Sequence, residues 1–221
     1  MNDIVIFGDT SFAAIVAEYI NSEKENRVVA FTLDAEYIND RKTFEGVPLV
    51  AFEHINEKYP PENYKLLIAV SAGSKAKHLN SKKFDEAKSK GYQFFTFIHS
   101  TSFIADTAKL GENVLIFPHV IVEPRAIINN GVIVRSAAYV SHETEIGAFS
   151  YLAPRATFSG KIKTGSHCFF GTNSTIRDGL TIGDDVIIGA GATALKNLDN
   201  QTVLKVAESV VLPVDRFKLN V

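Results

Sequence analysis

Residues 131–160 read GVIVRSAAYVSHETEIGAFSYLAPRATFSG, and a large apolar residue falls on every sixth position of this stretch. The same beat runs in one phase through Ile98, Ile104, Leu110, Ile116, Val122, Ile128, Val134, Val140, Ile146, Leu152, Phe158, Thr164, Phe170, Ile176, Ile182, Ile188 and Ala194. An α-helix repeats at 3.6 residues and a plain strand at two. A repeat of six therefore predicts short parallel strands stacked turn upon turn as a β-solenoid.

The residues between the beats support this interpretation. Compact side chains stand four positions after many beats, at Ser102, Ala108, Ala126, Ala138, Thr144, Ser150, Ala156, Cys168, Ser174 and Ala192. Glycine follows the beat directly at Gly111, Gly147, Gly165, Gly171, Gly183 and Gly189, where we expect it to relax tight turns. Three hexads would form one triangular coil of about 18 residues. A β-sandwich is disfavoured, because its turn signals do not keep one phase for so long.

The first 97 residues follow a different pattern. Strands are expected at Ile4–Phe7, Val28–Leu33, Leu66–Val70 and Phe94–Ile98, with helices after Ser11 and at Ser81–Lys90. This alternation predicts a small parallel sheet with covering helices, a Rossmann-like α/β domain at residues 1–97. The solenoid would occupy residues 98–199, and residues 200–221 would form a C-terminal strand or extended tail over it.

Composition excludes several classes of function. The formal net charge is −2, and nothing suggests a nucleic-acid or polybasic membrane surface. Cys168 is the one cysteine, so no internal disulfide forms, which fits a reducing cytoplasm. Its place at a compact solenoid position indicates packing. The start shows no signal-peptide pattern and no apolar run is long enough to span a bilayer, so a cytoplasmic protein without a metal site is expected.

Five residues stand at the carboxyl ends of the expected strands, where open α/β sheets bind ligands: Gly8, Thr10, Ser11, Asp34 and Gly73. The loop from Gly8 to Ser11 precedes a helix N-terminus, whose free N–H groups can hold phosphate. Asp34 can bind a ribose or a base edge. Thr10 or Ser11 can equally be a helix cap, and Asp34 a solvated turn residue. Without a full G-x-G-x-x-G, a dinucleotide site is not indicated.

Four histidines belong to the solenoid: His99 at its entry, and His119, His142 and His167 within it. His142 stands out because Glu143 follows it. Histidine can act as a general base near neutral pH, and a neighbouring carboxylate can orient the ring. On composition alone, each of these histidines is more often a surface turn residue.

A Rossmann-like domain followed by hexads resembles the sugar acyltransferases of the left-handed β-helix superfamily. The chain looks most like the branch that acetylates nucleotide-linked amino sugars, whose relatives include sialic-acid O-acetyltransferases. The matching stretches are Ile4–Gly8, Phe94–Ser100, Val140–Gly147, Phe169–Ile176 and Ile188–Thr193. The resemblance implies a left-handed helix and a homotrimer, with acetyl-CoA as co-substrate in the groove between neighbouring solenoids.

The resemblance also implies roles for particular residues. His142 would take a proton from the acceptor amine, and Glu143 would orient its imidazole. The acetyl-CoA groove would be lined by Gly160, Gly171, Gly189, Ala190 and Gly191. The α/β domain would hold the nucleotide of the sugar, which points to Gly8, Thr10, Ser11, Asp34 and Gly73.

The sequence also departs from this family. The stretch Val203–Ser209 lacks the family's Gly-x-Pro-Ala-Lys segment near the CoA adenine. Arg135 replaces an asparagine that some members carry near the sugar, seven residues before the catalytic histidine, so a different acceptor sugar is expected to contact Arg135. Tyr151 replaces a second histidine.

We therefore predict an acetyl-CoA-dependent N-acetyltransferase acting on a nucleoside-diphosphate-linked amino-deoxy sugar, by direct transfer with His142 as general base. Two alternatives remain open at the level of sequence. One is an O-acetyltransferase of a sialic-acid-like sugar, and the other is a non-catalytic trimeric scaffold.

Overall fold

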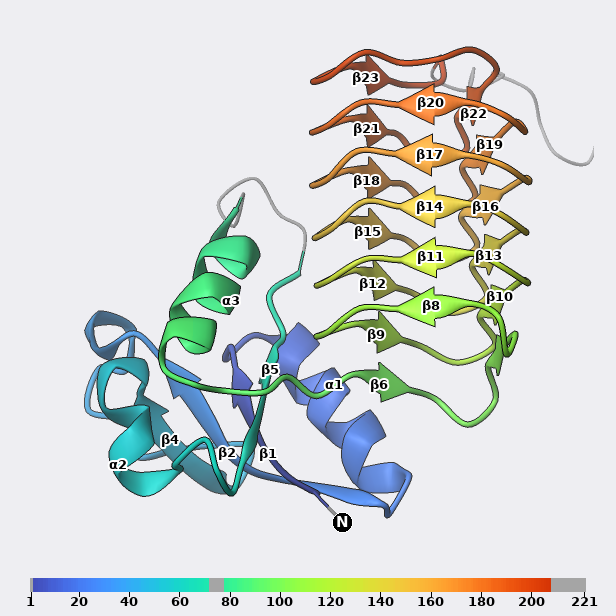
Figure 1. The fold of residues 1–221 in the computed structure, drawn as a ribbon. Helices are drawn as coiled ribbons and strands as arrows, with labels where there is room; N and C mark the ends of the chain where they lie inside the picture. The colour runs from blue at the N-terminus through green and yellow to red at the C-terminus, as the bar shows by residue number, and fades with distance from the viewer. Residues whose placement is uncertain (1, 72–77, 208–221) are drawn as a thin grey trace, which may run out of the picture.

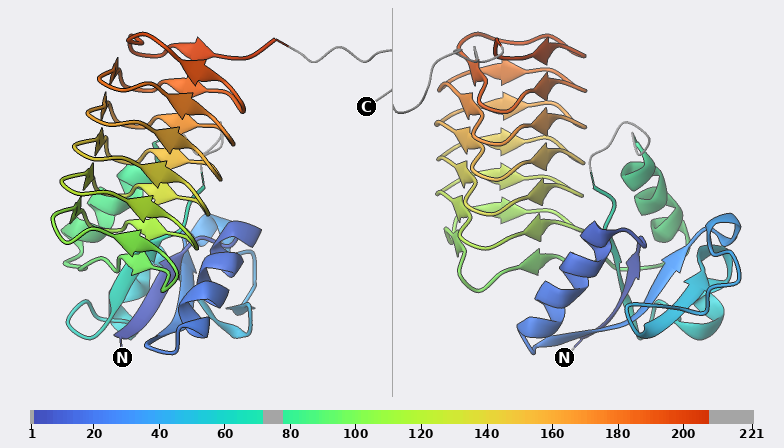
Figure 2. Two further views of the ribbon diagram at one scale, coloured as in Figure 1. Left: turned by 90° about the vertical axis from the view of Figure 1, so that its right-hand side faces the viewer. Right: turned by 180° about the vertical axis from the view of Figure 1, so that it is seen from behind.

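The computed structural model of the chain describes residues 2–71 and 78–207. Gly73 and the part of the expected tail from 208 to 221 lie outside the described residues. The molecule consists of a small α/β domain and a column of stacked coils that rises beside it (Figures 1 and 2). No helix in the described ranges has both the length and the hydropathy that a bilayer-spanning segment requires.

The α/β domain is built on a five-stranded sheet in the order β3-β4-β2-β1-β5. Its strands are β1 Asn2–Phe7, β2 Asn26–Leu33, β3 Thr43–Phe44, β4 Val47–Ala51 and β5 Lys65–Ile68. All neighbours are parallel except β3, which is antiparallel to β4, so the sheet is mixed and not purely parallel. The strand expected at Phe94–Ile98 is not part of it. Phe94 forms a single bridge to Leu66, and Phe97–Ile98 already belongs to the solenoid.

Helices cover both faces of this sheet. They are α1 Ser11–Ser22, α2 Ile55–Lys58 and α3 Leu79–Ser89, with 3₁₀ turns η1 Ala35–Tyr37 and η2 Phe52–His54. The buried face of α1 packs on one side of the sheet, and α2 and α3 pack on the other. The α1 side shares one hydrophobic cluster with Leu115, Phe117 and Ile133 of the solenoid. The two parts of the chain are therefore joined through a common core.

Three parallel sheets form the walls of the solenoid. Sheet I holds β6 Phe97–Ile98, β9 Leu115–Ile116, β12 Ile133–Val134, β15 Tyr151–Leu152, β18 Phe169–Phe170, β21 Ile187–Ile188 and β23 Val203–Leu204. Sheet II holds β7 Phe103–Ile104, β10 Ile121–Val122, β13 Tyr139–Val140, β16 Thr157–Phe158, β19 Thr175–Ile176 and β22 Thr193–Ala194. Sheet III holds β8 Lys109–Leu110, β11 Ile127–Ile128, β14 Glu145–Ile146, β17 Lys163–Thr164 and β20 Thr181–Ile182.

The pairing register gives the coil its length. Val134 pairs with Leu152, and Leu152 pairs with Phe170, so each coil spans three hexads, as the sequence predicts. The last coil is shorter, because Ile187 pairs with Val203, which comes before the position that three full hexads would reach. Residues 200–207 thus add one more strand to sheet I.

The beat residues fill the inside of the column. Ile116, Val134 and Leu152 are fully buried, and even Thr164 is only 4% exposed. Ile98 departs from this expectation, because its side chain is 42% exposed. The reason is its position in β6, the first strand of sheet I, which pairs with β9 on one side and has no coil beneath it.

The turns do not use glycine as the sequence suggested. The left-handed residue of each turn is every sixth one from Asn113 to Gly191, three positions after the beat, and most of these are not glycine. The glycines that directly follow the beat have another function. A Cβ at Gly147 would lie 2.0 Å from the carbonyl oxygen of Gly165 in the next coil. The same holds for Gly111, Gly165, Gly171 and Gly183, where the next coil leaves no room for a side chain, whereas Gly189 is less crowded.

Candidate active site

His142 lies at the corner between sheets II and III, where the chain passes from β13 to β14. In Figure 1 this corner is on the right-hand side of the column, away from the α/β domain. The imidazole is about half exposed, and its Nδ1 lies 3.3 Å from Oε2 of Glu143. Within the described chain, Nε2 has no hydrogen-bond partner, so it is the ring nitrogen available to a substrate.

Gly160 provides the space for the His142 ring. It occupies the same corner one coil later, and a Cβ at this position would lie 2.6 Å from Cε1 and 2.7 Å from Nε2 of His142. Any larger residue would push the imidazole away. The structure therefore brings Gly160 to the predicted base, although a whole coil of chain separates the two residues.

Glu123 anchors the same corner, and the sequence reasoning missed it. Its carboxylate accepts hydrogen bonds from Ser141 Oγ and Tyr139 Oη, each at 2.6 Å, and from the backbone N–H of His142 at 2.9 Å. These hydrogen bonds, the one from Ser141 first, lower the pKa of Glu123. The coil length of three hexads was the signal that could have found it, because Glu123 stands one coil before Ser141.

Glu143 is held as an anion beside the ring. Its pKa is lowered first by the hydrogen bond with His142 and next by the charge of Arg125, whose Nη2 lies 3.5 Å from Oε1. A carboxylate that stays ionised at Nδ1 favours the tautomer with its proton on that nitrogen. Nε2 then carries the free lone pair that a general base needs.

Gly8, Thr10 and Ser11 meet at the carboxyl end of β1, as expected. Gly8 passes so close to β5 that a Cβ there would lie 2.9 Å from the carbonyl oxygen of Ala69. Thr10 is the N-cap residue of α1, but its side chain makes no capping hydrogen bond. Among the residues that the structure describes, no side chain therefore caps the first N–H groups of α1. Ser11 lines a groove of about 460 Å³ between α1 and β4.

Asp34 has a partner within the domain. Its Oδ1 lies 2.6 Å from Nζ of Lys83, a buried lysine that also contacts Glu86 at 2.6 Å. The carboxylate is thus part of an ion-pair network that fixes α3 to the end of β2, and it is not a solvated turn residue.

The residues expected to line the acetyl-CoA groove lie on two different corners. Gly160 is at the His142 corner, whereas Gly171 and Gly189 follow strands of sheet I, in the same column as Arg135. A Cβ at Gly171 would lie 2.5 Å from the backbone nitrogen of Ala190, so close stacking of the coils explains this glycine. Ala190 and Gly191 are on the surface, and a Cβ at Gly191 would meet nothing within 4 Å.

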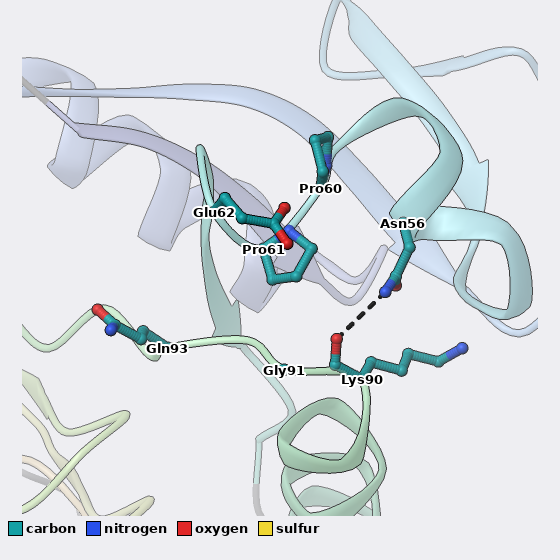
Figure 3. Close-up of a pocket in the computed structure, with 7 residues that line it drawn as sticks. All are labelled: Asn56, Pro60, Pro61, Glu62, Lys90, Gly91 and Gln93. Carbon is teal, nitrogen blue, oxygen red and sulfur yellow. Dashed lines mark hydrogen bonds between the residues drawn. The ribbon is translucent and has the colours of Figure 1, made fainter.

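A larger cavity, of about 530 Å³, lies elsewhere in the α/β domain (Figure 3). It is lined by Asn56, Pro60, Pro61, Glu62, Lys90, Gly91 and Gln93. These residues precede β5 or follow α3, so the cavity lies at the amino end of β5. None of the predicted site residues that the structure describes lines it.

Cys168 is buried inside the column. It is 2% exposed, and burial raises the pKa of its thiol to about 11, so the reactive thiolate is suppressed. In the part of the chain that the structure describes, no three histidine, cysteine or acidic side chains gather closely enough to hold a metal ion.

Comparisons with known proteins agree with this architecture. The profile of the bacterial transferase hexapeptide family (six repeats) matches residues 161–194. The acetyltransferase domain of PglB from Neisseria gonorrhoeae FA1090 has a TM-score of 0.80 and 22% identity, over 92% of this chain and 96% of that one. PerB from Caulobacter crescentus, solved with CoA and GDP-perosamine, has a TM-score of 0.80 and 24% identity, over 92% and 93%.

WeeI from Acinetobacter baumannii AYE superposes with a TM-score of 0.77 at 21% identity, covering 92% of this chain and 96% of its own. The PglB domain has also been solved in complex with acetyl coenzyme A. The chain therefore carries the bacterial transferase hexapeptide repeat and shares, along nearly its whole length, the fold of these acetyltransferases.

Proposed function

We propose that this protein is an acetyl-CoA-dependent N-acetyltransferase of a nucleoside-diphosphate-linked amino-deoxy sugar, with His142 as general base. The observation that carries the proposal is the set of contacts that hold His142 at its corner of the solenoid. Glu143 holds Nδ1, Gly160 provides the space beneath the ring, and Glu123 fixes the backbone N–H. A histidine that only occupies a surface turn would not need these three contacts.

The chemistry assigned to this corner is proton transfer during acyl transfer. The acceptor amine attacks the thioester carbonyl, the C–N bond forms, and the C–S bond breaks to release CoA. His142 Nε2 takes the proton that the amine loses, and the departing thiolate accepts a proton in return. Glu143 stabilises the imidazolium that exists between these two events.

The same proposal assigns different roles to the two parts of the chain. Residues 1–97 would hold the nucleotide at the carboxyl end of the sheet, where the uncapped N-terminus of α1 can bind phosphate. Residues 98–199 would supply the base and the acetyl-CoA groove, followed by the tail 200–221. The course of the front strands in Figure 1, from right to left as the chain climbs, supports the left-handed sense of the coils.

The two candidate regions lie on different sides of one chain, and this supports a shared site. The corner that carries His142 points away from the α/β domain (Figure 1). A second copy is needed to bring a base to the acceptor, and a closed trimer does this with one kind of interface. We expect about three times the chain mass of 24.2 kDa in solution. A fully active monomer at micromolar concentration would exclude the shared site.

The decisive test is release of the free CoA thiol. Purified protein is incubated with acetyl-CoA and a panel of nucleotide-linked amino sugars, with the matching hydroxy sugars and sialic-acid-like sugars as separate arms. Release with an amino sugar, and a product heavier by one acetyl group, supports the proposal. Release only with hydroxyl acceptors would instead favour the O-acetyltransferase. No release with any acceptor would favour the non-catalytic scaffold.

A further inference from the structure

Arg135 carries a charge that the described protein does not balance. It follows β12 at the corner between sheets I and II, and its guanidinium makes one hydrogen bond, from Nη1 to the hydroxyl of Tyr151 at 2.9 Å. Its Nε is buried and, within residues 2–71 and 78–207, has no hydrogen-bond partner. Among the described residues, no carboxylate forms an ion pair with it, although other arginines such as Arg27 and Arg41 have one.

The guanidinium is nevertheless held in a fixed place. It lies 4.6 Å from the ring centroid of Phe117 on the solenoid and 5.5 Å from that of Phe12 in the first turn of α1. Tyr151, its hydrogen-bond partner, is stacked on Phe169 of the next coil, with ring centroids 5.5 Å apart. Aromatic rings from both parts of the chain therefore orient a cation at their junction.

A buried polar atom without a partner needs a physical explanation. The aromatic contacts account for the position of Arg135 but not for its missing counter-charge. The neighbouring feature has the same sign: α1 begins beside Arg135 with N–H groups that Thr10 does not cap, and helix N-termini favour negative charge. The junction thus presents two electropositive groups and, within the described residues, no paired anion at Arg135.

We propose that Arg135 binds an oxyanion of the acceptor, a phosphate or a carboxylate, at this junction. The planar fork of arginine fits both groups through two parallel hydrogen bonds. This inference rests on the proposed function only in calling the anion part of the acceptor. A phosphate would be that of the nucleotide, whereas a carboxylate would make the acceptor an acidic sugar.

The test is direct binding, so that it does not depend on acetyl transfer. Calorimetric titrations of the full chain with inorganic pyrophosphate, UDP, GDP, CMP and N-acetylneuraminate are compared for the wild type, Arg135→Gln, Arg135→Lys and Arg27→Gln. Arg27→Gln is the matched control, because it removes an exposed arginine near the start of β2, at the opposite, amino end of the strands. Arg135→Met keeps the apolar stem over Phe117 if the glutamine variant folds poorly.

We expect Arg135→Gln and Arg135→Met to weaken binding of one anion class by about 10-fold to 100-fold, the range of a charge-assisted hydrogen bond. Arg135→Lys should weaken it less, and Arg27→Gln should leave it unchanged. A loss confined to pyrophosphate and the nucleotides assigns a phosphate, and a loss confined to N-acetylneuraminate assigns a carboxylate.

Two results would overturn the inference. One is a wild type that binds none of these probes at millimolar concentration. The other is unchanged affinity in the Arg135 variants with a lower Tm, which would make Arg135 a purely structural contact between Phe12 and Phe117. His142→Ala should keep anion binding while losing CoA release, so failure of the proposed function and failure of this inference give different results.

Discussion

The corners at His142 and at Arg135 use the same six-residue turn, but their charges are balanced differently. At the His142 corner, two carboxylates, Glu123 and Glu143, meet hydroxyl, imidazole and guanidinium partners of the chain itself. At the other corner, Arg135 has a neutral phenol and aromatic rings around it. The solenoid backbone fixes where each side chain stands, while the charge balance differs between the corners. This difference is the basis for proposing proton transfer at His142 and anion binding at Arg135.

Replacing His142 removes the proposed general base from its corner and has the largest expected effect. A positioned general base contributes roughly 10²–10⁴-fold to rate, so His142→Ala should lower kcat by about that factor. The Tm should change little, because the imidazole is 47% exposed. Steady-state kinetics and a thermal melt check this. Nearly full kcat would contradict the role of His142 as general base, and His119 and His167 would become the candidates.

Gly160→Ala tests whether the space under the ring is needed. The added methyl group would lie 2.6 Å from Cε1 of His142, so the ring must shift. A misplacement of about 1 Å can cost about 10²-fold in rate. The double variant Gly160→Ala/His142→Ala is the control. It should be no slower than His142→Ala alone, and a further loss would show that Gly160 acts in some other way.

Glu143→Gln sharpens the role of the carboxylate. The amide keeps a hydrogen-bonding oxygen near Nδ1 but removes the negative charge that stabilises the imidazolium. We expect kcat to fall on the order of tenfold, less than for His142→Ala. Arg125→Gln is measured for comparison with Glu143→Gln, because Arg125 contacts the Glu143 carboxylate and not the imidazole ring. An effect of Glu143→Gln as large as that of His142→Ala would mean that the carboxylate itself handles the proton.

Mixing two impaired chains tests whether the two corners meet between copies. In oligomers formed from equal amounts of His142→Ala and Arg135→Gln chains, about one site in four would combine an intact His142 with an intact Arg135 of its neighbour. At low acceptor concentration, activity should recover to about a quarter of the wild-type value. No recovery would mean that both residues must come from one chain.

Glu123→Gln should have the smallest effect, visible as a change in how stability depends on pH. Hydrogen bonds from Ser141 and Tyr139 lower the pKa of Glu123 in the folded protein, so its stabilisation is present above the unfolded pKa and is lost as the pH falls through the folded pKa. We expect a lower Tm than wild type at pH 7 and a smaller difference at pH 3. An equal difference at both values would exclude the charged form as the cause.

Much of the solenoid could be predicted because one short-range rule is repeated. The beat positions are buried because each coil presents the same inward direction every six residues, as at Ile116 and Val134. The hairpin of β3 and β4 was missed, since its two strands are short and β4 carries a proline, Pro48. Glu123 was not predicted, because its role depends on Ser141 one coil later. Arg135 was singled out only through the family resemblance, and its aromatic surroundings could not be predicted because Phe12 belongs to the other domain.

The constant register of three hexads also has a consequence for the dimensions of the molecule. Each coil adds one strand spacing, about 4.8 Å, to the height of the column. Removing one whole coil, residues 151–168, would shorten the column by that amount and leave every later side chain on its original face. The vertical distance from His142 to the surface pair Ala190 and Gly191 is therefore set by the number of coils between them. In a solenoid of this kind, the number of coils alone can adjust this distance to the length of an elongated acyl carrier. The residues at either end of the distance need not change.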